Sequence, residues 1–385
     1  MASFRKDADY ALPRATPPDV TLARARKAGA AIGVTRVADL TGVDRIGLPV
    51  CQAVRPLSRS LSVSQGKGLT PTDAQISALM ECLELHTVEW LEPGPIRASA
   101  RRLGGEALRI WRTLPSWRDD LTPFDLDEIQ DWIAGIDLTT GAPTPVPFRV
   151  VSMDTRRVRH GGPANSNGLA SGNDGAEATV AALCELLERD ALARWLSAGM
   201  MQRNRMVVEA GTIEDAFLRD FLQRLGAAGF TVLLWDLSEW HGVPTFCCTI
   251  LEAAAPFEKG VPPSTGTGCH PRKAVALFRA ISEAAQTRSA FIVGAREDID
   301  PDWYAGARGR GGRAMLDALP HWTAKRRAWS DIPEMEPAES DALDWLIARA
   351  AAAGARAIVR ATLRDGDLVV VKILAPGLLN GETIR

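Results

Sequence analysis

The sequence lacks the residue patterns on which several common classes of site are built. Its 385 residues include six cysteines and five histidines, and no two cysteines have the Cys-x-x-Cys spacing of a zinc or redox site. The Walker pattern G-x-x-x-x-G-K-[ST] of P-loop proteins is missing as well. We therefore do not expect a His/Cys metal centre, a histidine-activated nucleophile or a P-loop.

Strong net charge and long apolar runs are also missing. The formal net charge is -2, so there is no general basic field to hold nucleic acid. No apolar run reaches the length of a transmembrane helix, and residues 1–16 have no apolar signal-peptide core. These absences predict a cytoplasmic protein that binds neither nucleic acid nor membrane and keeps its cysteines reduced. Cys82 and Cys184 fall within helical patterns and are expected to be core thiols.

The composition is that of a globular protein, with 46% hydrophobic and 24% charged residues. Helical and extended patterns alternate irregularly, which predicts an α+β chain of mixed sheets and helices. We predict an N-terminal extension over 1–40 and one catalytic domain over 41–385. Strong helices are expected over 73–90, 174–197 and 271–290, further helices over 21–33, 217–228 and 341–353, and strands over 49–55, 60–64, 131–137, 146–153, 230–237, 244–251, 355–363 and 367–375.

Three segments, 64–85, 166–189 and 264–288, have one plan. Each opens with a stretch that contains at least two glycines, interpreted as a loop, and continues into an Ala-rich amphipathic helix. Each helix carries two acidic or amide side chains three residues apart, a spacing that keeps both on one face. Pro71 and Pro271 are predicted at the first helical position, and Asn173 or Asp174 is predicted to cap the second helix. The spaced pairs are Glu81/Glu84, Glu185/Glu188 and Glu283/Gln286, with Ser77 and Glu177 on the faces of the first and second pairs.

These residue types suit magnesium and phosphate. Carboxylates are the oxygen ligands that Mg²⁺ prefers, while Gly-rich loops and helix N-termini favour phosphate anions. Lys67 lies in the first Gly-rich stretch, and Arg189 and Arg288 follow the second and third pairs, where they could offset phosphate charge. A single Glu-x-x-Glu is usually a solvated helix face. Here the spaced pair occurs in three similar segments, with glutamine replacing one glutamate in the third. This repetition favours a single cleft lined by the three polar helix faces.

The same stretches resemble the YcaO-domain family. The resemblance rests on DRIGLPVCQAVRPLSRSLSVSQGKGLTPTDAQISALMECLELHTVE (44–89), SNGLASGNDGAEATVAALCELLERDA (166–191), ISEAAQTR (281–288) and VVVKILAPGLLNGE (369–382). It extends over about residues 40–382 and implies a YcaO-like α+β fold around a central ATP/Mg cleft. It also implies an enzyme that uses ATP to phosphorylate the oxygen of a peptide amide. A Cys, Ser or Thr side chain that then adds to the amide carbon yields an azoline, and external sulfide yields a thioamide.

The resemblance assigns roles to residues of the three segments. It implies ATP and Mg²⁺ as cofactors but identifies no catalytic residue, in keeping with phosphoryl transfer, which positioning and charge neutralisation serve without a protein nucleophile. By this resemblance the magnesium ligands are Glu81, Glu84, Glu185 and Glu188, and the nucleotide contacts are Lys67, Ser77, Asn167, Asn173, Glu177, Arg189, Glu283, Gln286 and Arg288.

The stretch RPLSRSLSVSQGKGLTP is most similar to family members encoded beside a TfuA-type partner, which are associated with thioamides. Azoline-forming members often end in Pro-x-Pro-x-Pro, whereas this sequence ends LLNGETIR. Thioamide formation is therefore favoured, with an azoline-forming cyclodehydratase as the alternative. Expected partners are a ribosomally made peptide or protein, a TfuA-like or other peptide-delivery protein, and a second copy in a homodimer. A non-catalytic peptide-presenting module and an ATP-dependent ligase or kinase for a small molecule remain alternative interpretations.

Overall fold

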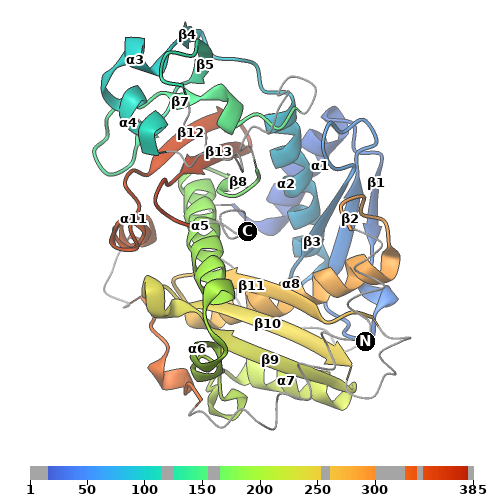
Figure 1. Cartoon of the computed structure of the whole chain (residues 1–385). Helices are drawn as coiled ribbons and strands as arrows, with labels where there is room; N and C mark the ends of the chain where they lie inside the picture. The colour runs from blue at the N-terminus through green and yellow to red at the C-terminus, as the bar shows by residue number, and fades with distance from the viewer. Residues whose placement is uncertain are drawn as a thin grey trace.

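Small antiparallel sheets, each paired with helices, make up the computed structural model of the chain (Figure 1). The structure describes residues 16–113, 125–154, 165–252, 261–299, 326–335 and 341–379. Within these residues the strands form four sheets, in the orders β1-β2-β3, β11-β10-β9, β6-β12-β13-β8 and β4-β5-β7. The predicted α+β class of mixed sheets and helices is confirmed. The Gly/Arg-rich stretch 308–313 lies outside the described residues.

Most strands follow the predicted apolar stretches within a few residues. The stretches 264–269 and 169–172, interpreted from the sequence as loops, are strands. The first pairs with the apolar strand 245–252, and the second pairs with 369–374, a strand far away in the sequence. The strands are β1 (Arg36–Asp39), β2 (Val50–Val54), β3 (Val63–Lys67), β4 (Ile96–Ala98), β5 (Gln130–Ile133), β6 (Ile136–Asp137), β7 (Val146–Pro147), β8 (Leu169–Gly172), β9 (Phe230–Asp236), β10 (Thr245–Glu252), β11 (Ser264–Cys269), β12 (Val359–Arg364) and β13 (Val369–Leu374).

The three strongly predicted helices are present and bury their apolar stripes. Ile76, Leu79 and Leu83 of the first, and Leu183 and Leu187 of the second, are buried. The six helices predicted from apolar periodicity all form, whereas the shorter α3, α4 and α6 were not predicted. The helices are α1 (Pro18–Ala31), α2 (Pro71–Glu89), α3 (Ala100–Leu103), α4 (Gly105–Thr113), α5 (Gly175–Ser197), α6 (Met200–Arg205), α7 (Ala216–Ala227), α8 (Lys273–Val293) and α11 (Ala342–Ala352).

The starts of the three long helices follow their local sequence to different degrees. Thr70 and Asp73 form a capping box at α2, with Pro71 at the first position, and Asp174 caps α5 by accepting a hydrogen bond from the Glu177 amide. The prediction that the third helix starts at Pro271 is wrong, since α8 begins at Lys273. The His270 imidazole accepts a hydrogen bond from the Arg272 amide at 3.0 Å, which keeps that residue extended.

Glycines in three strands allow the helix that follows to lie directly on the strand. A Cβ atom on Gly66 of β3 would lie 2.1 Å from the Ala78 nitrogen of α2, and one on Gly266 of β11 would lie 2.2 Å from the Ala284 nitrogen of α8. Gly172 of β8 stands in the same relation to α5. The interpretation of these three glycines as parts of loops is therefore wrong. They lie in strands and permit close strand–helix packing.

Three strand–helix units, β3–α2, β8–α5 and β11–α8, thus meet in the middle of the molecule. In Figure 1, α5 runs between the sheet of β12, β13 and β8 and the sheet of β9, β10 and β11, with α2 beside it. α1 packs on α2, and β1 pairs with β2, so both elements that precede residue 41 join this arrangement. The division into an extension and a catalytic domain at that residue stays a prediction.

The cysteines and the apolar helices match expectation where the structure describes them. All six cysteines are buried free thiols, and Cys82 and Cys184 lie in the core as predicted. Among the described helices, none is both long enough and apolar enough to cross a membrane.

Candidate magnesium and nucleotide site

The candidate site forms where the edge strands β3, β8 and β11 of three sheets face the helices that follow them. An edge strand has backbone N–H groups without a strand partner. Here carboxylates of α2 accept hydrogen bonds from two of these groups: Glu81 from the Gln65 amide at 2.9 Å, and Glu84 from the Ser171 amide at 2.8 Å. The two glutamates of one helix therefore face the edges of two different sheets.

The carboxylates of α5 occupy the other side of this space. Glu185 accepts a hydrogen bond from the Gly168 amide at 3.2 Å, next to β8. Glu188 accepts one from the Thr267 hydroxyl of β11 at 2.7 Å. The same hydroxyl lies 3.4 Å from Glu283 of α8. Thr267 thus connects the second and third predicted pairs through one side chain.

Two cations lie among these carboxylates. Lys67 Nζ is 2.9 Å from Glu283, and an Arg189 guanidinium nitrogen is 3.5 Å from Glu188. Burial by itself lowers the pKa of Arg189, but Glu188, Glu283 and Glu185 together raise it above its ordinary value. Arg189 is therefore firmly cationic at the centre of the predicted cleft, where a phosphate would need neutralisation.

The acidic groups on α2 and α5 are short of positive charge. Burial, together with the nearby charges of Glu81 and Glu185, raises the pKa of Glu84 to about 8 against the hydrogen bonds from Ser171. Burial likewise raises the pKa of Glu185 to about 7, with Arg189 opposing and Glu188 adding to the shift. Burial raises the pKa of Glu81 as well, against the charge of Arg296. A half-buried group of oxygen ligands that resists ionisation in the absence of a cation fits Mg²⁺.

Glu283 behaves in the opposite way. Burial acts to raise its pKa, but Lys67 and Arg189 outweigh burial and lower it to about 2. Its carboxylate is therefore ionised and bound to protein cations. Its lowered pKa sets it apart from Glu81, Glu84 and Glu185. This agrees with its predicted role as a nucleotide contact, separate from the four predicted magnesium ligands.

Within the described residues, no three carboxylate, imidazole or thiolate groups already surround one point at metal-binding distance. Each of the four predicted ligands instead accepts a hydrogen bond from the protein. Glu81 and Glu84 each bind a backbone N–H through one oxygen, so their carboxylates keep lone pairs that could hold Mg²⁺. Their assignment as ligands stays a prediction that the electrostatics of the cluster favour.

Four of the predicted nucleotide contacts have separate surroundings: Asn173 and Glu177 bind each other at the start of α5, while Ser77 and Asn167 lie on α2 and before β8. The Asn173 amide donates to Glu177 at 3.0 Å, and its oxygen accepts a hydrogen bond from the Thr21 hydroxyl of α1 at 2.9 Å. Ser77 is half-buried on α2. Asn167 is half-buried, and its carbonyl oxygen accepts a hydrogen bond from Lys372 at 2.7 Å.

The last two predicted contacts, both on α8, have different surroundings. Gln286 donates to the Gln65 carbonyl oxygen at 3.5 Å, beside the carboxylates. Arg288 is buried and bound to two carboxylates, those of Asp44, at 2.8 Å, and of Glu252. The structure therefore shows a protein-held ion pair at Arg288, and its predicted contact with the nucleotide stays a prediction.

Sequence reasoning missed several residues that position the site. Ser171 and Thr267 lie in the stretches read as loops, where serine and threonine gave no distinct signal. Lys372 offered one signal, a single lysine within the apolar run VVVKIL, which is unusual for a buried strand. Gln65 and Arg296 gave none, because their places depend on how β3 lies beside α8.

The chain matches a known family and is similar to several known proteins. Residues 65–379 match the family model described as YcaO cyclodehydratase, ATP- and Mg²⁺-binding. An uncharacterised protein in the tfuA 3′ region of Rhizobium leguminosarum bv. trifolii is 31% identical, over 97% of this chain and 90% of its own. An uncharacterised protein of Mycobacterium tuberculosis is 33% identical, over 95% of this chain and 82% of its own.

Solved structures have the same fold. The YcaO protein from Methanopyrus kandleri, bound with AMPPCP and Mg²⁺, has a TM-score of 0.72 and 23% identity, over 97% of this chain and 93% of that one. A heterocyclase in complex with substrate and cofactor has a TM-score of 0.71 and 20% identity, over 95% of this chain. This chain spans about half, 53%, of that heterocyclase.

Proposed function

Because this chain belongs to the YcaO family, we propose that it uses ATP and Mg²⁺ to phosphorylate the oxygen of a peptide backbone amide, and that sulfide then replaces this oxygen. One observation carries the proposal. Partly buried glutamates from α2 and α5, two of them with pKa values near neutrality, lie with the buried Glu188 at three sheet edges beside the cationic Arg189. These oxygen donors would suit a divalent cation that neutralises phosphate charge.

In this proposal the residues divide into two groups. Glu81, Glu84, Glu185 and Glu188 hold Mg²⁺, which when bound neutralises charge on the phosphates. Arg189 and Lys67 lie where they would offset the remaining phosphate charge. The proposed contacts with the rest of the nucleotide and its γ-phosphate are Ser77, Asn167, Asn173, Glu177, Glu283, Gln286 and Arg288.

The reaction balances without a nucleophile from the protein. The amide oxygen attacks the γ-phosphorus and ADP leaves. Sulfide adds to the amide carbon, and phosphate then leaves with the former amide oxygen, so that C=S replaces C=O. The chain's own thiols are poorly suited to supply the sulfur, because all six are buried, and burial raises the pKa of Cys247 to about 12.

A second candidate is azoline formation, in which a Cys, Ser or Thr side chain of the substrate adds to the activated carbon. The similar fold of a protein named as a heterocyclase supports this candidate. The two reactions share the phosphorylation step and differ in the nucleophile. The relative from the tfuA 3′ region supports the proposal of a TfuA-like partner and, with it, thioamide formation. A homodimer and a cytoplasmic location complete the proposal.

The test is a comparison of peptide masses in the organism that encodes this chain. Peptides from a deletion strain, a strain complemented with the wild-type gene and one complemented with Glu185→Gln are compared by mass spectrometry. A peptide that gains the mass difference between sulfur and oxygen only with the wild-type gene supports thioamide formation. A peptide that loses one water supports azoline formation.

Two results would contradict the proposal. If neither mass change depends on the gene, amide modification is wrong. If calorimetry on the purified protein finds no binding of AMPPCP with Mg²⁺, the chain is a peptide-presenting module without nucleotide chemistry. Rapid ATP cleavage with a small molecule and no peptide would instead favour a ligase or kinase.

A further inference from the structure

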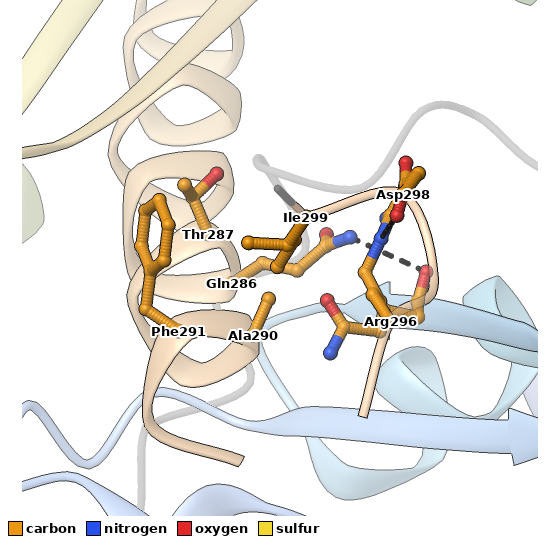
Figure 2. A pocket seen from close by; sticks show the side chains of 8 residues that line it. Gln286, Thr287, Ala290, Phe291, Arg296, Asp298 and Ile299 are labelled. Carbon is orange, nitrogen blue, oxygen red and sulfur yellow. Dashed lines mark hydrogen bonds and ion pairs between the residues drawn. The ribbon is translucent and has the colours of Figure 1, made fainter. Parts of the chain in front are cut away.

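A cavity of about 250 Å³ lies beside the carboxylate cluster, between β3, the second half of α8 and the segment that follows α8. Figure 2 shows side chains of α8 on one side and Arg296 with Asp298 on the other, with the side chains of Gln286 and Ile299 between them. The segment after α8 is held near β3 because the Ser62 amide donates to Glu297 at 3.3 Å. The residues around the cavity are Gln65, Gln286, Thr287, Ala290, Phe291, Arg296, Asp298 and Ile299.

The cavity adjoins the proposed phosphorylation site through Gln65. The backbone of Gln65 faces the cluster: its N–H donates to Glu81, and its carbonyl oxygen accepts from Gln286. Arg296, on the far side of the cavity, lowers the pKa of Glu81, so the two charged groups lie within electrostatic reach. A group held in the cavity would therefore lie next to the glutamates proposed to hold magnesium.

The walls suit a neutral amide. The Gln65 side chain is only 3% exposed, and its Nε2 has no hydrogen-bond partner among the described residues. A buried donor without a partner costs free energy that an acceptor on a ligand would recover. A primary amide both donates and accepts, as a peptide group does, so Gln65 can pair with a peptide backbone. Ala290, Phe291 and Ile299 supply apolar surface for a neighbouring side chain.

Charge and size argue against a phosphate or a nucleoside as the occupant. Arg296 pairs with Asp298 through two contacts, at 2.9 and 2.6 Å, so the cation is already neutralised. The volume is also below the roughly 300–1,000 Å³ of pockets that enclose drug-sized ligands. It suits one amino-acid residue of a longer chain.

We propose that this cavity is the acceptor subsite, which holds the residue next to the amide to be activated, with Gln65 bound to its backbone and Phe291 and Ile299 against its side chain. The inference depends on the proposed function, since it names where the peptide lies relative to the nucleotide. It adds Phe291 and Ile299, which neither the sequence motifs nor the nucleotide chemistry require.

The experiment fills the cavity. Ala290→Phe places a ring in it from α8, and Ile292→Phe makes a comparable change at a 37% exposed position of the same helix that does not border the cavity. The probe is a pool of N-acetylated, C-amidated tetrapeptides of randomised sequence. Two quantities are measured for each protein: ADP release stimulated by the pool, and affinity for AMPPCP with Mg²⁺. Thermal melts establish that each variant is folded.

We expect Ala290→Phe to lose at least about tenfold of the peptide-stimulated ADP release, with AMPPCP affinity within about twofold of wild type, a split typical of lost acceptor binding. Ile292→Phe should retain both properties. In a second measurement that needs no turnover, p-benzoylphenylalanine at position 291 should crosslink the pool in the presence of AMPPCP and Mg²⁺, and the same group at position 292 should not.

Three results would overturn the inference. Wild-type stimulation in folded Ala290→Phe would show that the acceptor lies elsewhere. An equal loss of AMPPCP affinity would place the cavity in the nucleotide site. If the pool neither stimulates ADP release by the wild-type protein nor crosslinks at position 291, no peptide binds in this cavity. In that case amide activation is still tested separately by the gene-dependent mass change of peptides. Failure of the acceptor subsite can therefore be distinguished from failure of the proposed function.

Discussion

Lys372 of β13 donates from Nζ to the carbonyl oxygen of Asn167 at 2.7 Å, and to that of Asn165 at 2.6 Å. The lysine is 2% exposed, so its charge lies in the interior. Its two acceptors flank the turn whose Gly168 amide binds Glu185, and its charge lowers the pKa of that glutamate. One buried cation therefore holds the turn before β8 and favours the ionised form of a proposed magnesium ligand.

Replacing this lysine should weaken metal binding without contact between lysine and metal. In Lys372→Met, two part-buried carbonyl groups lose their donor, which costs at most about 1–3 kcal/mol each. Glu185 also holds its proton to higher pH. We expect affinity for AMPPCP with Mg²⁺, measured by calorimetry, to fall about tenfold or more at neutral pH and to recover partly as pH rises. The control is Lys273→Met, which removes a lysine at the start of α8. A uniform loss at every pH would contradict the electrostatic part of this role.

Removing one carboxylate charge from α5 should abolish turnover and preserve the fold. Glu185→Gln and Glu188→Gln keep the side-chain size, and an amide oxygen can still accept from Gly168 or Thr267. We therefore expect no ADP release, with a melting temperature without Mg²⁺ that is not lowered and is raised for Glu185→Gln. Glu209→Gln, at an exposed position, is the matched control. Turnover like that of wild type in both α5 variants would refute the metal assignment.

Metal binding should displace protons. The pKa of Glu84 is raised to about 8 and that of Glu185 to about 7, so without metal the folded state binds protons more tightly than the unfolded state. Between the ordinary carboxyl pKa and these values, their contribution to stability falls as pH rises. Melts in EDTA should therefore show a loss of stability from about pH 5 to about pH 8, levelling off above that, which Mg²⁺ reverses. Mg²⁺ affinity should rise over the same range, and affinity that falls with pH would contradict the assignment.

The strand glycines can be tested apart from the chemistry. Gly66→Ala would place a methyl group 2.1 Å from the Ala78 nitrogen, so β3 and α2 must separate. We expect a loss of about 1–3 kcal/mol or more in the free energy of unfolding, measured with urea. Gly226→Ala, where nothing lies within 4 Å of an added Cβ on the helix α7, should instead stabilise by about 0.5–1 kcal/mol. Equal stability of the two variants would show that close packing does not require Gly66.

Local sequence predicted the helices of the site well. The capping residues Thr70 and Asp174 lie at the starts of α2 and α5, and the spacing by three holds each glutamate pair on one helix face. These features depend on residues within one or two turns of each other. The start of α8 differs because the His270 side chain and the Pro271 carbonyl bind elsewhere, the latter to the Met335 amide, a distant residue.

The nature of the Gly-rich stretches depended on long-range pairing. Gly172 is in a strand because it pairs with Val369, and Gly266 because it pairs with Cys248. A glycine in a short apolar stretch is compatible with a turn, a loop or a closely packed strand. Only the partner strand selects among these, and no local pattern specifies that partner.

By itself the sequence determined the three helices that carry the spaced side chains, because these follow from residue types at short separations, and its motifs determined the family through their resemblance to YcaO-domain proteins. The tertiary structure decided the rest. It showed that strand glycines serve packing, that Thr267 connects Glu188 with Glu283, that Arg288 is held by Asp44 and Glu252, and that Gln65 borders a cavity beside Glu81. Each of these depends on contact between segments far apart in the chain, and such contacts are set by how the sheets and helices pack together.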